Sequence, residues 1–262
     1  MSADLIKELR AATPENTLMI TDTGNHQTWV EQYWDAPGPQ MVFTPGGFAV
    51  WCEERRCTIS GGESGAPPGE IRDARYGVYL ERDIHLEMSH VVVRDCTSQG
   101  IAAEDWSDRR GGSKAHLVDV RVTGCEGVAV EVGRLTLERV LIDANPGSGI
   151  GGASSPSIVA DGLTVTGNAF SAGCQINGCE GIDVHRLRGC NVVVTDNAGL
   201  GIHARRVSLK DSVVTGNVRA GVLKDVVTAK RPALKDVECG RSLGWGTLAM
   251  TPWGVCALDS AL

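Results

Sequence analysis

Residues 191–217 read NVVVTDNAGLGIHARRVSLKDSVVTGN, which is one sequence repeat followed by the start of the next. A run of β-branched residues ends in a polar turn, Thr-Asp-Asn or Thr-Gly-Asn, and a short segment of Gly and apolar residues follows. β-Branched residues favour strands, whereas Asn, Asp and Gly favour turns. A period of about 20 to 50 residues is typical of solenoids. The segment therefore predicts a stack of short strands.

The polar turn recurs along the chain at steps of 29, 20, 23, 29 and 20 residues. Its last residues are Cys96, Cys125, Asn145, Asn168, Asn197 and Asn217. A second register, Gly followed by Ile or Val, recurs with it at Gly100, Gly127, Gly149, Gly181, Gly201 and Gly221. Because the two sets of positions advance along the chain at similar spacings, they predict coils of strands. We expect each turn residue to face its counterpart about 4.8 Å away, where side-chain amides can form a hydrogen-bonded ladder.

This pattern resembles the right-handed parallel β-helix family of pectate lyases, polygalacturonases, uronan epimerases and periplasmic copper-loading accessory proteins. The resemblance covers roughly residues 76–240. It implies an all-β fold, a right-handed parallel β-helix solenoid, whereas activity depends on individual site residues. We expect a short α/β segment at 1–48, a junction and loop at 49–75, the solenoid at 76–240, and a C-terminal cap at 241–262 that covers the open end.

Composition narrows the classes of partner and location. The net charge of -7 argues against nucleic acid, and no apolar run approaches the roughly 20 residues needed to span a membrane. Nine Cys form no Cys-x-x-Cys pair, and no signal peptide is seen, which together predict reduced thiols and a cytoplasmic location. The cysteines near coil turns, predicted to be stacked small hydrophobes, are Cys96, Cys125, Cys174, Cys179, Cys190 and Cys239.

The first 48 residues follow a different pattern. Residues 4–12 predict an amphipathic helix, 17–21 a buried strand, 22–27 a loop, and 28–34 a helix. Residues 15–29, 32–33 and 43–48 resemble the opening of the diphosphate-binding domain of thiamine-diphosphate enzymes of the acetolactate synthase and glyoxylate carboligase type.

In that family the matching loop contacts the diphosphate, which implies cofactor-binding roles for Thr23, Gly24, Asn25 and His26. The Gly-Asp-Gly motif that holds Mg²⁺ is absent, and the resemblance ends near residue 48. We therefore do not expect thiamine-diphosphate catalysis from this chain alone.

Four outward residues on two neighbouring coils are candidate catalytic groups. Asp183 and His185 alternate with the inward Ile182 and Val184, and one coil later His203 and Arg205 follow the same pattern. Uronan lyases and epimerases need a base for the C5 proton and a cation, often Ca²⁺, to neutralise the carboxylate. The alternative is a solvated strand face in which charged and core residues alternate. The sequence shows no clustered Asp set for Ca²⁺ and no polygalacturonase motif.

A second candidate set lies around a loop at 105–114. It comprises Glu104, Asp105 and Asp108 beside Trp106, whose indole can stack on sugar. Residues 55–62 predict a first coil, and exposed loops are expected at 63–73 and 146–156. Three functions stay open: a β-helix that binds polysaccharide or is a degenerate uronan-processing module, a thiamine-diphosphate carboligase fragment, and a structural fusion without activity.

Overall fold

The computed structural model describes the residues given at the end of this paragraph, which divide into two compact units, Met1–Trp51 and Cys52–Leu262. Within these residues, no helix is long and apolar enough to cross a bilayer. The described residues are 3–13, 19–20, 42–43, 49–53, 55–61, 67–81, 83–104, 112–127, 129–151, 157–170, 180–219, 221–245 and 251–259.

The first unit contains a helix and a pair of short parallel strands. Helix α1 (Ala3–Ala11) confirms the predicted helix to within one residue at each end. Strands β1 (Met19–Ile20) and β2 (Val42–Phe43) pair in parallel, and β1 lies inside the strand predicted at 17–21. The loop predicted at 22–27 and the helix predicted at 28–34 lie outside the described residues.

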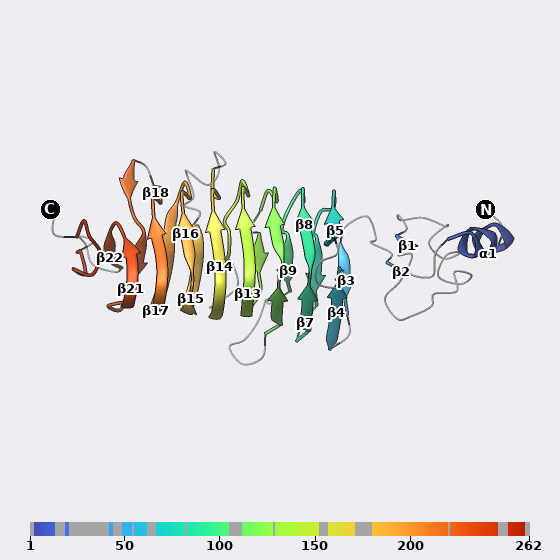
Figure 1. Ribbon diagram of the computed structural model, residues 1–262, viewed down its shortest axis with the longest axis horizontal. Helices are drawn as coiled ribbons and strands as arrows, with labels where there is room; N and C mark the ends of the chain where they lie inside the picture. The colour runs from blue at the N-terminus through green and yellow to red at the C-terminus, as the bar shows by residue number, and fades with distance from the viewer. Residues whose placement is uncertain are drawn as a thin grey trace. The chain divides into compact units, whose positions relative to one another are not determined.

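The regular structure described in the second unit consists of strands, which confirms the all-β class (Figure 1). The first strand, β3 (Val50–Cys52), begins in the first unit and ends at the first residue of the second. The other strands are β4 (Arg56–Ser60), β5 (Gly69–Arg72), β6 (Val78–Leu80), β7 (His85–Ser89), β8 (Val91–Arg94), β9 (Ile101–Ala103), β10 (Lys114–Val118), β11 (Arg121–Thr123), β12 (Val130–Glu131), β13 (Arg134–Asp143), β14 (Ser157–Thr166), β15 (Glu180–Cys190), β16 (Val193–Thr195), β17 (Leu200–Thr215), β18 (Val218–Arg219), β19 (Val222–Leu223), β20 (Val226–Thr228), β21 (Ala233–Cys239) and β22 (Ser242–Gly244).

Most of these strands pair in parallel with the strand one repeat away. The long sheet runs in the order β4-β7-β10-β13-β14-β15-β17-β20-β22, and β3, β6, β9 and β12 form a second sheet of four strands. The paired strands extend from Arg56 to Gly244, so the stack reaches beyond 76–240 at both ends. Strands β18 and β19 form an antiparallel pair.

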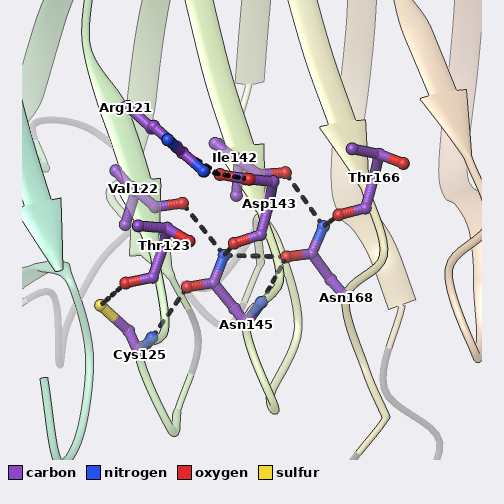
Figure 2. A network of polar contacts seen from close by, with 9 residues as sticks. All are labelled: Arg121, Val122, Thr123, Cys125, Ile142, Asp143, Asn145, Thr166 and Asn168. Atoms are coloured by element: carbon purple, nitrogen blue, oxygen red, sulfur yellow. Dashed lines mark hydrogen bonds and ion pairs between the residues drawn. The ribbon is translucent and has the colours of Figure 1, made fainter. Parts of the chain in front are cut away.

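A buried row of asparagines stabilises the recurrent turn, as the repeat predicts (Figure 2). The Nδ2 of Asn145 donates to the Oδ1 of Asn168 at 2.8 Å, and Asn168 donates to Asn197 at 3.0 Å. Asn197 donates to Asn217, which donates to the buried carboxylate of Asp225. We call Asn145, Asn168, Asn197 and Asn217 the Asn row. All four are 0 or 1% exposed.

The backbone explains the sequence of this turn. The residue before each ladder position has a positive φ, 62° at Gly167, 55° at Asp196 and 72° at Gly216. Gly adopts this left-handed conformation without steric cost, and Asp tolerates it better than most residues. The Thr-Gly-Asn and Thr-Asp-Asn signatures therefore combine a left-handed residue with a buried amide.

The prediction of an exposed loop over 63–73 is wrong for its last part. Gly69–Arg72 forms β5, which pairs in parallel with β8. The close approach needs glycine, because a Cβ on Gly69 would lie 2.7 Å from the Cα of Gly61. Residues 55–62 were predicted to start the coils, and β4 confirms this by pairing with β7.

The prediction of reduced cysteines is confirmed for Cys96, Cys125 and Cys190, which are free, and is wrong for Cys239. Cys96 and Cys125 are buried, whereas Cys190 is partly exposed. Cys239 forms a disulfide with Cys256, and a second disulfide joins Cys52 to Cys57. The repeat register does not predict either bond, because the partner of Cys239, Cys256, and the partner of Cys57, Cys52, lie outside the repeats. Disulfides persist mainly in oxidising compartments, so the cysteine argument for a cytoplasmic location no longer applies. Cys174 and Cys179 lie outside the described residues.

The C-terminal tail folds back onto the last strands. Asp259 is 7% exposed, and its carboxylate accepts hydrogen bonds from the backbone N–H groups of Ser242, Val255 and Cys256. These bonds and the Cys239–Cys256 disulfide hold residues 251–259 against the last strands of the stack.

Candidate functional site

Two strands place Asp183 and His203 directly opposite each other. Asp183 in β15 pairs with His203 in β17, one position after the buried pair of Ile182 and Ile202. Because side chains alternate along a strand, the aliphatic pair enters the core and the polar pair faces outward. The Nδ1 of His203 lies 3.0 Å from the Oδ1 of Asp183. A carboxylate on Nδ1 orients the imidazole and leaves Nε2 available for proton transfer.

The indole of Trp245 lies beside this imidazole. The ring centroids of Trp245 and His203 are 4.5 Å apart at an interplanar angle of 69°, which is an edge-to-face contact. Trp245 directly follows β22, and its backbone N–H donates to the carbonyl of Thr228. Half of Trp245 is exposed to solvent. An exposed indole held in place by backbone bonds gives a sugar ring a surface for stacking.

Glu180 adds a carboxyl group with an unusual affinity for protons. Its side chain is 13% exposed and lies 4.0 Å from Arg219. Burial, and after it the negative charge of Asp183, raise the pKa of Glu180 to about 7 against the opposing effects of His203 and Arg219. A carboxyl group with a pKa near neutrality can donate a proton as a general acid. We call Glu180, Asp183, His203, Arg219 and Trp245 the His203 site.

The four candidates from the sequence separate into two pairs. Asp183 and His203 share a hydrogen bond, whereas His185 and Arg205 occupy the next outward position on the same two strands. In the described part of the chain, no hydrogen bond or ion pair joins His185 or Arg205 to the first pair. Burial lowers the pKa of His185, and the positive charges of Arg205 and two neighbouring arginines lower it further.

Sequence reasoning missed Glu180, Arg219 and Trp245. Glu180 directly precedes the Gly-Ile of the repeat, a position where burial could have been expected. Trp245 lies in the apolar tail, which the sequence analysis assigned to capping alone. Arg219 lies in the short β18–β19 pair, which breaks the repeat and carries no sequence signal.

The remaining candidates do not form a second described site. Asp105, Trp106 and Asp108 lie outside the described residues, as do Thr23, Gly24, Asn25 and His26. Within the described ranges, no group of three or more His, Cys, Asp or Glu side chains is placed to hold a metal ion.

Comparisons with protein-family models, with curated proteins and with solved structures returned no match.

Proposed function

We propose that the stacked strands form a right-handed parallel β-helix solenoid that binds polysaccharide at the His203 site. The parallel pairing at the repeat spacing and the buried Asn row support this architecture. A repeat stack offers an extended surface, on which a linear polymer can contact several strands.

One observation carries the functional proposal. An imidazole that is oriented by a carboxylate lies in contact with a half-exposed indole. In this arrangement Trp245 stacks on a sugar ring, and the Nε2 of His203 faces the sugar as a base. A solvated strand face needs neither the hydrogen bond nor the adjoining aromatic surface.

The reaction that suits these groups is elimination from a uronan, a polymer of sugar acids. His203 takes the proton from C5 through Nε2, and the electron pair of the broken C–H bond forms the C4–C5 double bond. The C4–O bond breaks, and protonated Glu180 gives its proton to the leaving oxygen. Before this transfer Glu180 is protonated and uncharged, so the positive charge of Arg219 is available to the uronate carboxylate.

The test is incubation of the purified chain with polygalacturonate, alginate and neutral dextran, followed by absorbance of unsaturated products and by binding measurements. We expect His203→Ala and Glu180→Gln to abolish product formation with binding retained, and Trp245→Ala to weaken binding. His116→Ala is the matched control, because His116 is bonded to Glu87 and Glu138 instead. Unchanged product formation by His203→Ala contradicts the reaction, and the lack of any glycan binding contradicts the function.

A thermal-shift titration of the purified chain distinguishes the alternative functions. A rise in thermal midpoint with thiamine diphosphate and Mg²⁺ that is lost in His26→Ala favours the carboligase fragment. A lack of response to every ligand favours the structural fusion. Because a ligand at 100 times its dissociation constant stabilises the native state by about 2.7 kcal/mol, the thermal shift is readily measured.

A further inference from the structure

One outward row of the long sheet carries a basic side chain at six of its seven positions. Each member pairs in register with the next, so the row follows the stack from β4 to β17. We call it the basic row, and its positions are Arg56, His85, Lys114, Arg134, Ser157, Arg186 and Arg206. Neighbouring strands lie about 4.8 Å apart, so these six steps span about 29 Å.

Five of the six basic members have no ion pair among the residues that the structure describes. His85 is the exception, because its Nε2 lies 3.0 Å from a carboxylate oxygen of Glu87. The five unpaired members are exposed, and they are Arg56, Lys114, Arg134, Arg186 and Arg206. Some arginines elsewhere on the same coils are paired, for example Arg121 with Asp143 and Arg139 with Asp119. Five members of the row therefore carry a charge that no carboxylate of the described chain neutralises.

This arrangement does not stabilise the fold. Arg186 and Arg206 lie directly opposite each other, and like charges at such positions destabilise a sheet. Arg188 and Arg205 are also exposed and extend the positive surface at this end of the row. The whole chain carries a net charge of -7, so an excess of basic residues does not explain the row. An anionic ligand would relieve the repulsion that the folded chain leaves in place.

We propose that the basic row binds a linear anionic polysaccharide that lies along the stack, with carboxylate or sulfate groups contacting its arginine and lysine side chains. The row is straight and extended, and guanidinium groups bind both anions through paired hydrogen bonds. This face adjoins the His203 site, since Asp183 and His203 each lie three residues before a row member. The inference does not depend on the reaction proposed for His203, because it needs only charge and register.

The row suits nucleic acid and lipid less well. Single-stranded nucleic acid is normally bound by aromatic side chains that stack on the bases. The exposed aromatic residues of the described chain are Trp51, Phe170 and Trp245, and none of them lies in the strands of the row. A single file of cations is also narrower than the broad basic surface that anionic lipid attracts.

The test compares one row variant with a matched control of equal charge. The row variant is Arg134→Ser/Arg186→Ser/Arg206→Ser. The control, Arg72→Ser/Arg121→Ser/Arg139→Ser, removes three arginines that are already ion-paired with carboxylates. Binding is measured by calorimetry at two salt concentrations. The probes are polygalacturonate, dextran sulfate, neutral dextran, oligothymidylate and vesicles that contain phosphatidylserine.

We expect the full chain to bind polygalacturonate or dextran sulfate and not neutral dextran, with affinity falling as salt rises. The row variant should lose at least tenfold in affinity and the control less than twofold. The polygalacturonate and dextran sulfate arms show whether carboxylate or sulfate is preferred. Arg186→Glu serves as a second variant if the triple variant unfolds, and it should also lose at least tenfold.

Several outcomes overturn the inference. Equal losses in the row variant and the control mean that binding follows net charge alone. Tighter binding of oligothymidylate or vesicles than of either polysaccharide assigns the row to another class of partner. His203→Ala should keep its affinity for the anionic polysaccharide. Binding that depends on the row without any reaction product would confirm the row and contradict the reaction. Product formation that depends on His203, with equal binding by the row variant and the control, would do the opposite.

Discussion

The Asn row and the basic row each repeat a side-chain type along the same stack of strands. They differ in whether the folded chain provides hydrogen-bond or ion-pair partners for these side chains. Every amide of the Asn row donates to the next member or to Asp225, and all four are buried. The basic row is exposed, and five of its members have no ion pair among the described residues. Periodicity alone therefore indicates the architecture. Internal bonding separates the row that stabilises the fold from the row that is available to a ligand.

The largest expected effect comes from breaking the Asn row at Asn197. Its Oδ1 accepts from the backbone N–H and the Nδ2 of Asn168, and its Nδ2 donates to Asn217 and to the carbonyl of Val165. Asn197→Ala leaves several buried polar groups without partners and should lower the free energy of unfolding by about 3 to 5 kcal/mol. Urea denaturation followed by circular dichroism measures this change.

The matched control lies earlier in the same row of turns. Cys96 occupies the ladder position there, and its thiol makes weak contacts with the carbonyl of Arg94, at 3.7 Å, and with the thiol of Cys125. Cys96→Ala should therefore cost about 1 kcal/mol. Equal losses in Cys96→Ala and Asn197→Ala would show that side-chain volume, and not the amide bonding, stabilises the turn.

The next effect concerns the disulfide that holds the tail. Cys239 and Cys256 are 17 residues apart, and closing a loop of this size stabilises a protein by about 2 to 3 kcal/mol. Cys256→Ser should lower the free energy of unfolding by that amount, and reductant should then have little further effect at this bond. The measurement is urea denaturation with and without reductant. A midpoint that is unchanged in Cys256→Ser would show that the bonds of Asp259 alone hold the tail.

The sequence predicts the Asn row better than it predicts the His203 site or the basic row. Its turn residues recur in a polar register, and the Asn ladder follows from spacing and chemistry alone. The inward Ile182 and Val184 were also correct, because alternation along a strand is a local property. Trp245 could not be predicted as a partner of His203, since the contact joins the repeat to a tail outside its period.

The basic row was also missed, for a different reason. Steps of unequal length separate its members, so their alignment becomes visible only when the register of every strand is known. The raised pKa of Glu180 depends on burial and on Asp183, which sequence spacing does not report.

Glu180 is largely buried, as the Asn row is, but among the described residues its carboxylate has only a distant cation, Arg219 at 4.0 Å, as an ion-pair partner. Its pKa is about 7 in the folded chain and near 4.5 in an unfolded chain, so the folded state binds more protons between these values. Stability should therefore fall as pH rises from about 4.5 to 7, by about 2 kcal/mol. Denaturation at pH 5 and pH 8 measures the difference. Glu180→Gln should remove most of it, and a pH dependence that persists in that variant assigns it to another group.

The smallest effect is expected from the basic row itself. Arg206→Ser removes an exposed side chain that faces Arg186, so the free energy of unfolding should change by less than about 0.5 kcal/mol. Any change at low salt should be a gain, because repulsion between the two guanidinium groups is relieved, and added salt should reduce it by screening. Arg139→Ser is the control, since it breaks the ion pair with Asp119 and should give a small loss under the same conditions. A loss above about 1 kcal/mol in Arg206→Ser would mean that the arginine stabilises the fold. The basic row would then belong with the Asn row, and the distinction between a structural row and a ligand-binding row would fail.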